Sequence, residues 1–217
     1  MAAARLAVYL LLFMLFRDAL SLSGLWSVGG GYFLWMRFAQ NVPSLLLLGA
    51  FSALFVLGLF HWERELARGV RWIRGSAARA VGLGLLGGAI VAGPALVAGF
   101  FVSSWGRGGP VPVSLWPAIA WLSFAGNLLE ETLFRGFLQA RLASALGEGR
   151  ALLGSALAFA TAHAALAAQI GGWTGLSLVA FTFYEGLICA WLSRRHGLLA
   201  AALAHGLGIF LLSTGLP

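Results

Sequence analysis

Two adjacent glutamates and an arginine stand within the apolar stretch NLLEETLFRGF, residues 127–137. Glu131 and Arg135 are four residues apart, so they can form an ion pair along one face of a helix. Glu130 is turned about 100° from that face and has no evident neutralising partner on its own helix. The spacing favours Glu130 as the carboxylate that does chemistry, with Glu131 and Arg135 as its support. The alternative is that both glutamates only pair with Arg135 and with histidines.

Three further ionisable residues, His163, Glu185 and His205, interrupt other apolar stretches. Such residues are costly in a bilayer and usually face a cavity or one another. A carboxylate and imidazoles around a hydrated pocket can take a proton from water, deliver it to a leaving amine and stabilise an oxyanion. Alternatively, Glu130, His163 and His205 could hold a divalent metal such as zinc, whose bound water would be the nucleophile. No HExxH segment is present, and the sequence leaves both mechanisms open.

The composition indicates that these residues belong to a membrane protein. Of 217 residues, 60% are hydrophobic and 10% charged, and the mean hydropathy is +0.91. A water-soluble domain of this size could not bury so much apolar surface. We predict an all-α polytopic membrane protein, a single domain over residues 1–217, with about seven transmembrane helices of roughly 20 residues each. Their expected ranges are 5–23, 41–61, 79–104, 112–141, 150–169, 173–193 and 197–214.

The basic residues predict how the chain is oriented. The net charge is +7, and all 14 basic residues are arginines that mostly fall between apolar runs, which is a topology signal rather than a nucleic-acid footprint. A cytoplasmic N-terminus leaves only Arg37 and Arg107 outside. It places the following residues at or near the inner side: Arg5, Arg64, Arg68, Arg71, Arg74, Arg79, Arg135, Arg141, Arg150, Arg194 and Arg195. The absence of lysine beside abundant Ala, Gly, Leu and Arg is typical of a GC-rich bacterial genome, so we expect a bacterial inner membrane and no nucleic-acid partner.

Helical rise then predicts the depth of each ionisable group. Counted from the inner ends of their helices, Glu130 lies roughly 16 Å deep, His163 about 18 Å, Glu185 about 13 Å and His205 about 12 Å. Four helices thus place one group each in a shared layer, which favours a single polar site. On the fourth segment, a polar stripe with four-residue spacing accompanies this layer: Ser123, Asn127, Glu131, Arg135 and Gln139.

Two other pairs of residues are expected to have structural roles. Arg17 and Asp18 are about 100° apart on the first helix, so we expect them not to pair well with each other and instead to lie near the outer end or contact another helix. Gly84 and Gly88, four residues apart, allow another helix to approach closely.

Three motifs resemble those of a known family, the CAAX protease and bacteriocin-processing (Abi) family of intramembrane endopeptidases. EETLFR at 130–135 is similar to its EExxxR motif, and FATAH at 159–163 to its FxxxH motif. GLICAWLSRRHGLLAAALAH, which ends at His205, resembles the third block. The resemblance covers about residues 112–214. It implies that Glu130 and His163 activate the attacking water, that His205 helps to stabilise the oxyanion, and that Glu131 and Arg135 support the first motif. The family has been described both as metal-dependent and as glutamate-type, so the metal stays open.

One residue departs from the family pattern. Many members carry Asn four residues after the last histidine, where this chain has Ile209, and Asn127 is the nearest replacement by helix position. Glu185 lies outside the motifs and is either an addition to the polar site or a partner for a histidine.

The sequence therefore favours an intramembrane endopeptidase whose substrate is a membrane protein or peptide surrounded by membrane lipid, for example a C-terminal sorting tail. Two other functions stay open. A layer of Glu and His residues is also found in proton-coupled transporters and channels. Such transporters often consist of two repeated halves, and no such repeat is evident in this sequence. A non-catalytic bacteriocin-immunity or scaffold protein could keep the same fold without turnover.

Overall fold

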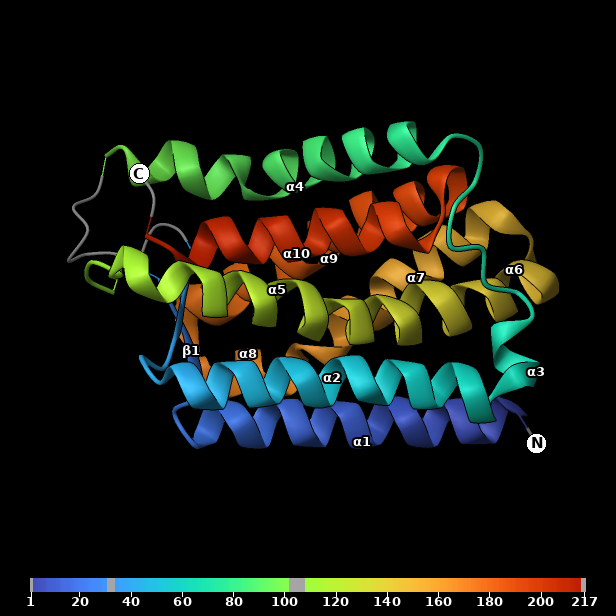
Figure 1. The fold of residues 1–217 in the computed structure, drawn as a ribbon, viewed down its shortest axis with the longest axis horizontal. Helices are drawn as coiled ribbons and strands as arrows, with labels where there is room; N and C mark the ends of the chain where they lie inside the picture. The colour runs from blue at the N-terminus through green and yellow to red at the C-terminus, as the bar shows by residue number, and fades with distance from the viewer. Residues whose placement is uncertain (1, 31–33, 102–107, 216–217) are drawn as a thin grey trace.

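The computed structural model describes residues 2–30, 34–101 and 108–215, most of which are helical. The long helices lie side by side along the longest axis of the molecule (Figure 1). In chain order, the elements are α1 Ala2–Leu22, β1 Trp26–Gly30, β2 Leu34–Phe38, α2 Val42–Trp62, α3 Arg64–Ala67, α4 Ala77–Gly99, η2 Val113–Leu115, α5 Trp116–Glu131, η3 Thr132–Leu138, α6 Gln139–Leu146, α7 Glu148–Ala162, α8 Ala164–Ile170, α9 Gly172–His196 and α10 Leu198–Ser213.

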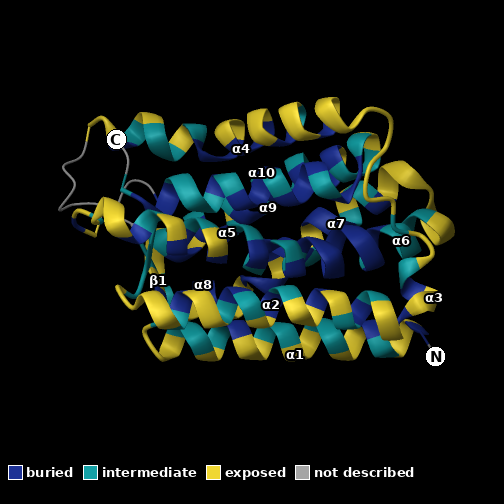
Figure 2. Ribbon diagram, viewed as in Figure 1, coloured by how far each residue is buried: buried dark blue, intermediate teal, exposed yellow. Residues whose placement is uncertain are grey.

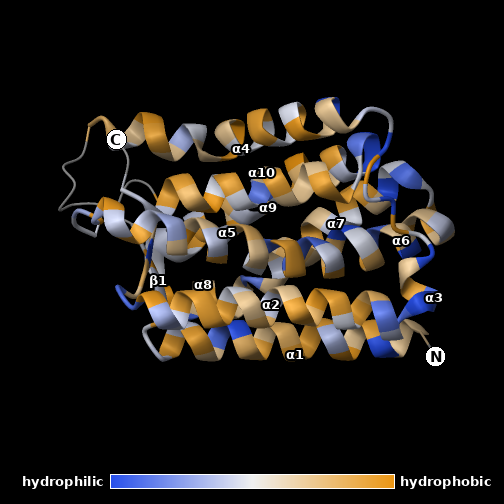
Figure 3. Cartoon of the chain, viewed as in Figure 1, coloured by the Kyte–Doolittle hydropathy of each residue, from blue (hydrophilic) through white to orange (hydrophobic). Residues whose placement is uncertain are grey.

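Four helical stretches in the described chain are long and apolar enough to cross a membrane: α2, α4, α9 and the stretch Glu148–Ile170, which α7 and α8 form together. The outward faces of α2 and α4 expose large apolar side chains, such as Leu47 at 71% and Val97 at 60%. The exposed and hydrophobic faces coincide in Figures 2 and 3. Apolar residues turned outward are stable only against lipid or a partner. The protein is therefore an all-α polytopic membrane protein, whereas the number of spans and the cytoplasmic N-terminus stay predictions.

Several predicted segments differ in detail from the observed helices. The segment predicted over 112–141 continues to Leu146, and the one over 150–169 is interrupted at His163. The interval between the first two predicted helices contains an antiparallel hairpin in which Val28 of β1 pairs with Met36 of β2. Glycines in β1 weaken the strand pattern, so the hairpin was missed. The predicted end at residue 104, and Arg107, lie outside the described residues.

Close packing of α4 against α10 confirms the role predicted for the two glycines. A Cβ atom added to Gly84 would lie 2.8 Å from the Ala200 carbonyl oxygen, and one added to Gly88 would lie 2.6 Å from Leu207 Cβ. Because a larger residue would push the two helices apart, glycine is needed at both positions. Cys189 of α9 is fully buried in the same region.

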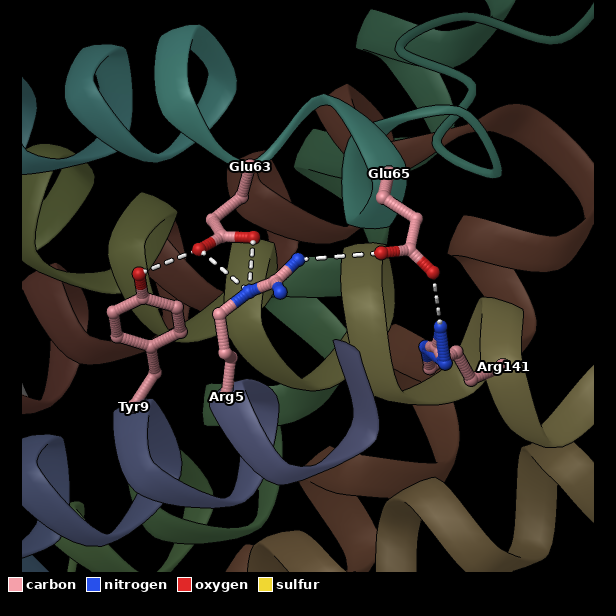
Figure 4. Close-up of polar contacts among 5 residues, drawn as sticks. All are labelled: Arg5, Tyr9, Glu63, Glu65 and Arg141. Carbon is pink, nitrogen blue, oxygen red and sulfur yellow. Dashed lines mark hydrogen bonds and ion pairs between the residues drawn. The ribbon is translucent and has the colours of Figure 1, made fainter. Parts of the chain in front are cut away.

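A group of polar side chains fastens α1 to the far end of α2, to α3 and to α6. We call Arg5, Tyr9, Glu63, Glu65 and Arg141 the peripheral network (Figure 4). Glu63 accepts hydrogen bonds from Arg5 Nε at 3.0 Å and from the Tyr9 hydroxyl at 2.7 Å. Glu65 accepts from Arg5 at 3.2 Å and from Arg141 at 3.4 Å. The network thereby fixes the side of the bundle on which α1 packs.

Candidate active site

The two adjacent glutamates lie where the helix changes its hydrogen-bonding pattern. Regular α-helix α5 ends at Glu131, and the π-helix η3 follows over Thr132–Leu138. A π-turn widens the helix, and such turns are frequent at functional sites. The change of pitch was not predicted from the sequence, because the apolar residues of TLFRGFL fit an α-helix equally well. Because of this change of pitch, Arg135 and Gln139 lie at a different angle around the helix axis, relative to Ser123 and Asn127, than an unbroken α-helix would give.

Glu131 is the centre of a buried chain of charged groups. Its side chain is fully buried, and its Oε1 lies 2.9 Å from Nη1 of Arg135. This confirms the predicted ion pair across four residues, although the two groups are not aligned as a hydrogen bond. The same Oε1 lies 2.8 Å from Nδ1 of His205, which donates to it. Glu131 therefore contacts both Arg135 of the first motif and His205, the last histidine.

His205, on α10, is flanked by two carboxylates. Nδ1 is held by Glu131, while Nε2 lies 3.6 Å from Oε1 of Glu185 on α9. His205 and Glu185 are 2% and 1% exposed, respectively. The sequence left open whether Glu185 is an addition to the polar site or a partner for a histidine. The structure shows that it is both, because Glu185 also lines the cavity described below.

His163 forms the joint between α7 and α8. Its backbone φ of −94° and ψ of −2° lie in the sparsely allowed bridge region that active-site residues often occupy. Nδ1 lies 2.9 Å from the Phe159 carbonyl oxygen. A carbonyl oxygen only accepts, so Nδ1 carries the proton and Nε2 of the neutral ring is left as an acceptor. The interruption of the helix orients the ring, and sequence periodicity alone gave no sign of it.

Phe159 packs between the charged residues of the site. Its ring lies 4.7 Å from that of His163 and 5.5 Å from that of His205, both edge-on. The guanidinium of Arg135 lies 4.1 Å from the same ring centroid, a favourable cation–π distance. One aromatic side chain from the second motif thus positions residues from all three motifs.

A cavity of about 150 Å³ brings the ionisable groups together. Glu130, His163, Glu185 and His205 all line it, although they come from four different helical stretches. Glu130 is only partly buried, and no hydrogen bond or ion pair to its carboxylate is found among the described residues. Glu131 and Arg135 do not line this cavity. The two adjacent glutamates therefore have different surroundings, in line with the predicted 100° between them: Glu131 pairs with Arg135, and Glu130 faces the cavity.

The remaining lining residues are mostly apolar, with a few polar groups. Ser123 and Asn127 of α5 lie on the cavity wall, as does Ile209 of α10. Asn127 is thus placed where an amide donor could reach the cavity. The hairpin was absent from the sequence-based site, yet it contributes a large share of the apolar wall: Trp26, Val28, Leu34, Trp35, Met36 and Phe38.

The expectation that Arg17 and Asp18 do not pair well with each other is wrong. Nη2 of Arg17 lies 2.7 Å from Oδ1 of Asp18, and Nε lies 3.0 Å from the same oxygen. The arginine side chain is long enough to reach Asp18 although the two Cβ directions differ by about 100°. Arg17 also contacts another helix, as expected, through a 2.6 Å hydrogen bond from Nη2 to the Ala162 carbonyl oxygen. It lines the cavity as well, which the sequence did not reveal.

The candidate metal ligands were tested against the geometry of the site. Within residues 2–30, 34–101 and 108–215, no group of three or more His, Cys, Asp or Glu side chains is arranged to hold a metal ion. Glu130, His163 and His205 line one cavity without forming such a group. Nδ1 of each histidine is held by another group, which is also how metal-bound histidines are commonly oriented.

The structure places a buried carboxylate–imidazole cluster among helices that are long and apolar enough to cross a membrane. Residues 112–210 match the family model described as type II CAAX prenyl endopeptidase Rce1-like. This match supports the resemblance of the region to the CAAX protease and bacteriocin-processing family, and with it a CAAX-type endopeptidase in general. All three motifs lie within the matched region, whereas Arg17 and the hairpin lie outside it. No curated protein and no solved structure matches the chain.

Proposed function

We propose that the protein hydrolyses a peptide bond in a membrane-anchored protein or peptide, with Glu130 and His163 activating water and His205 stabilising the oxyanion. The observation that carries this proposal is the shared cavity, which gathers Glu130, His163 and His205 from three distant parts of the chain. The partly buried carboxylate without an ion-pair partner supports Glu130 as the general base. A bacterial inner membrane, with lipid around the protein and no nucleic-acid partner, is part of the same proposal.

The first step is the attack of water on the scissile carbonyl carbon. A water molecule between Glu130 and Nε2 of His163 gives one proton to the Glu130 carboxylate, and its oxygen bonds to the carbon. The carbonyl double bond opens, and the electron pair moves onto the oxygen. Nε2 of His163 accepts a hydrogen bond from the attacking water and so orients it. This role is supported by the Phe159 carbonyl, which holds the proton of this ring on Nδ1.

The second step is collapse of the tetrahedral intermediate. Glu130 returns its proton to the amide nitrogen. The electron pair on the oxyanion re-forms the carbonyl double bond as the carbon–nitrogen bond breaks, which releases a free amine and a carboxylic acid, and the acid then loses its proton to water or to the amine. His205 donates from Nε2 to the oxyanion while Nδ1 stays bonded to Glu131. A ring between two carboxylates is suited to carry a proton on both nitrogens. Preorganised donors of this kind are often the largest contribution to lowering such a barrier.

Substrate binding is proposed to use the apolar part of the cavity. Its wall includes Leu122 and Leu129 of α5, Phe181 of α9 and the hairpin side chains. A peptide bond within an intact helix is not open to attack, so the substrate must be locally unwound before cleavage. Backbone groups exposed by unwinding need hydrogen-bond partners in this environment, and Ser123 and Asn127 are available in the wall. We propose Asn127 as the amide donor that replaces the asparagine missing at Ile209.

The proposal is tested by incubating purified protein in proteoliposomes with a panel of bacterial membrane-anchored peptides. Products are identified by mass spectrometry in water enriched in oxygen-18. Hydrolysis predicts one heavy oxygen in the new carboxyl group of the product. Glu130→Gln should lower the rate by about 10²–10⁴-fold, the range expected for a general acid–base group. Glu65→Gln is the matched control, because it neutralises an exposed carboxylate of the peripheral network.

Two results would contradict the proposal. Cleavage that survives Glu130→Gln would remove this carboxylate from the chemistry. Proton flux across the vesicles without cleavage of any peptide would favour the transporter instead. A folded Glu130→Gln variant, judged by an unchanged Tm and elution volume, is required for the comparison.

A further inference from the structure

A second cavity, separate from the candidate active site, lies at the end of the bundle where α3 and α6 are found (Figure 1). It measures about 180 Å³. Residues from the loop after α3, from η3 and α6, and from the junction of α9 and α10 line it. Hydrophilic residues gather at this end of the molecule (Figure 3). The predicted topology places this end in the cytoplasm.

The charge on this cavity is strongly positive. Four arginines line it, with Glu148 as the carboxylate among its described lining residues: Arg71, Arg74, Arg135 and Arg194. Arg194 Nε and Glu148 Oε2 pair at 2.7 Å. Within the part of the chain that the structure describes, no hydrogen bond or ion pair engages the guanidinium of Arg71 or Arg74. Most of the excess positive charge is therefore available to a ligand.

Buried polar atoms without partners also line the cavity. Arg135 is 2% exposed, and none of its three guanidinium nitrogens has an aligned hydrogen-bond acceptor in the described chain. Gln139 is 6% exposed and donates to the Ala190 carbonyl, while its Oε1 has no partner among the described residues. Buried polar groups are rarely left unsatisfied in native proteins. An anion with attached water in this cavity would satisfy both side chains.

The two free arginines are held at the cavity by the backbone. The amide groups of Leu198 and Leu199, at the start of α10, donate to the carbonyl oxygens of Arg71 at 2.8 Å and of Trp72 at 3.0 Å. Arg74 N donates in turn to the His196 carbonyl at 2.9 Å. The loop is thus anchored to the junction of α9 and α10, and this fixed backbone limits the entropy lost when the two guanidinium groups close on a ligand.

We propose that this cavity is a binding site for a phosphate group, carried either by an anionic lipid headgroup or by free inorganic phosphate. Several guanidinium groups around one cavity can each donate to a different oxygen of a phosphate group, and these hydrogen bonds are charge-assisted. In the predicted topology, this end of the bundle lies at the level of the anionic headgroups of the inner leaflet. Trp72 of the same loop is 41% exposed, and tryptophan is enriched at membrane–water interfaces.

The phosphate site adjoins the candidate active site through one residue. Arg135 lines the phosphate cavity, and its Nη1 is 2.9 Å from Glu131, which holds His205. A bound anion would share Arg135 with Glu131. This step rests on the proposed function: occupancy is expected to change the catalytic rate as well as the stability.

The test measures binding to the purified full-length protein in detergent. The Tm is followed during titration with short-chain phosphatidylglycerol, with short-chain phosphatidylcholine, and with inorganic phosphate against chloride at equal ionic strength. The double variant Arg71→Gln/Arg74→Gln is compared with Arg68→Gln/Arg79→Gln, which removes the same charge from arginines outside the cavity. Arg135 is left unchanged, so no residue of the candidate active site is altered.

The expected result is a saturable rise in Tm with phosphatidylglycerol or with inorganic phosphate, but not with phosphatidylcholine. The Arg71/Arg74 variant should bind about tenfold or more weakly, the loss expected for charged hydrogen bonds, and the Arg68/Arg79 variant should stay within about twofold of wild type. Saturation by inorganic phosphate would identify a free anion as sufficient, and a response to the lipid alone would identify the headgroup. Equal loss in both double variants, or no saturable response, would overturn the proposal.

Discussion

The peripheral network and the candidate active site are both built from carboxylates and arginines, but they differ in how fully the oxygens of their carboxylates are paired. In the peripheral network, Glu63 accepts from Arg5 and Tyr9, and Glu65 from Arg5 and Arg141. In the site, Glu131 Oε2 and Glu185 Oε1 are buried without a hydrogen-bond partner in the described chain. Paired groups near the surface hold helices together, whereas unpaired buried groups are available to a ligand.

The physical reason lies in what an unpaired group costs. A buried donor or acceptor without a partner destabilises a protein by about 1–3 kcal/mol, and more when it is charged. Groups kept in that state must be offset by packing elsewhere, and such exceptions gather where a protein binds or reacts. Substitutions in the two regions should therefore differ in whether they lower activity, stability or both.

Among the groups compared here, the largest effect is expected for His205, which lies between Glu131 and Glu185. His205→Gln removes the donor to the oxyanion, so peptide cleavage should fall by about 10²–10³-fold, as when an oxyanion-hole donor is lost. Cleavage is measured in proteoliposomes with any peptide that wild type hydrolyses. Because the amide of the substituted side chain can still donate or accept at one end, the Tm should fall only moderately. A rate close to that of wild type would show that His205 does not act on the reacting atoms.

Glu131→Gln should affect stability and activity together. The substitution leaves the buried charge of Arg135 without its ion-pair partner, and breaking such a pair typically costs about 3–5 kcal/mol. Denaturant unfolding in detergent should show this loss, and cleavage should fall because His205 is no longer held by a carboxylate. If activity fell while stability stayed unchanged, Glu131 would be acting in the chemistry rather than positioning His205.

Glu63→Gln should affect stability alone. Glu63 is 6% exposed and holds Tyr9 and Arg5, so losing its charge-assisted bonds should cost about 1–3 kcal/mol. The Tm should therefore fall by several degrees, while the cleavage rate of the folded protein stays within about twofold of wild type. A selective loss of cleavage would mean that the peripheral network takes part in function, and the distinction between the two regions would no longer hold.

The smallest effect is expected for Glu65→Gln. Its side chain is 53% exposed, and its partners Arg5 and Arg141 are 41% and 36% exposed. Ion pairs at exposed positions contribute little because water and salt screen them. Neither the Tm nor cleavage should change measurably at physiological salt. A clear fall in Tm would indicate that the whole peripheral network acts as one unit.

Local spacing was enough to predict the faces on which the polar residues lie. Glu131 and Arg135 form the predicted pair, while Glu130 turns away from them to the cavity. The glycine spacing in α4 likewise predicted close helix packing. These features depend on the helical repeat and on one or two turns of chain, and both can be read from the order of residues.

Contacts between distant segments were not predictable in the same way. The cavity wall built by the hairpin, and the hydrogen bond from Arg17 to Ala162, depend on how α1 and the hairpin pack against α7 and α8. The pairing of Arg17 with Asp18 was also missed, because angular spacing between Cβ atoms does not account for the length and rotamers of arginine.

By itself, the amino-acid sequence determined that this protein is helical, lies in a membrane and carries Glu130, His163 and His205 within apolar segments. Hydrophobic content and helical rise are properties of each segment alone, so no tertiary information was needed. Only the tertiary structure decided that Glu131 holds Nδ1 of His205 and that Glu185 stands near its other nitrogen. Those distances depend on how α5, α9 and α10 are rotated and packed against one another, which the order of residues in a single segment does not determine.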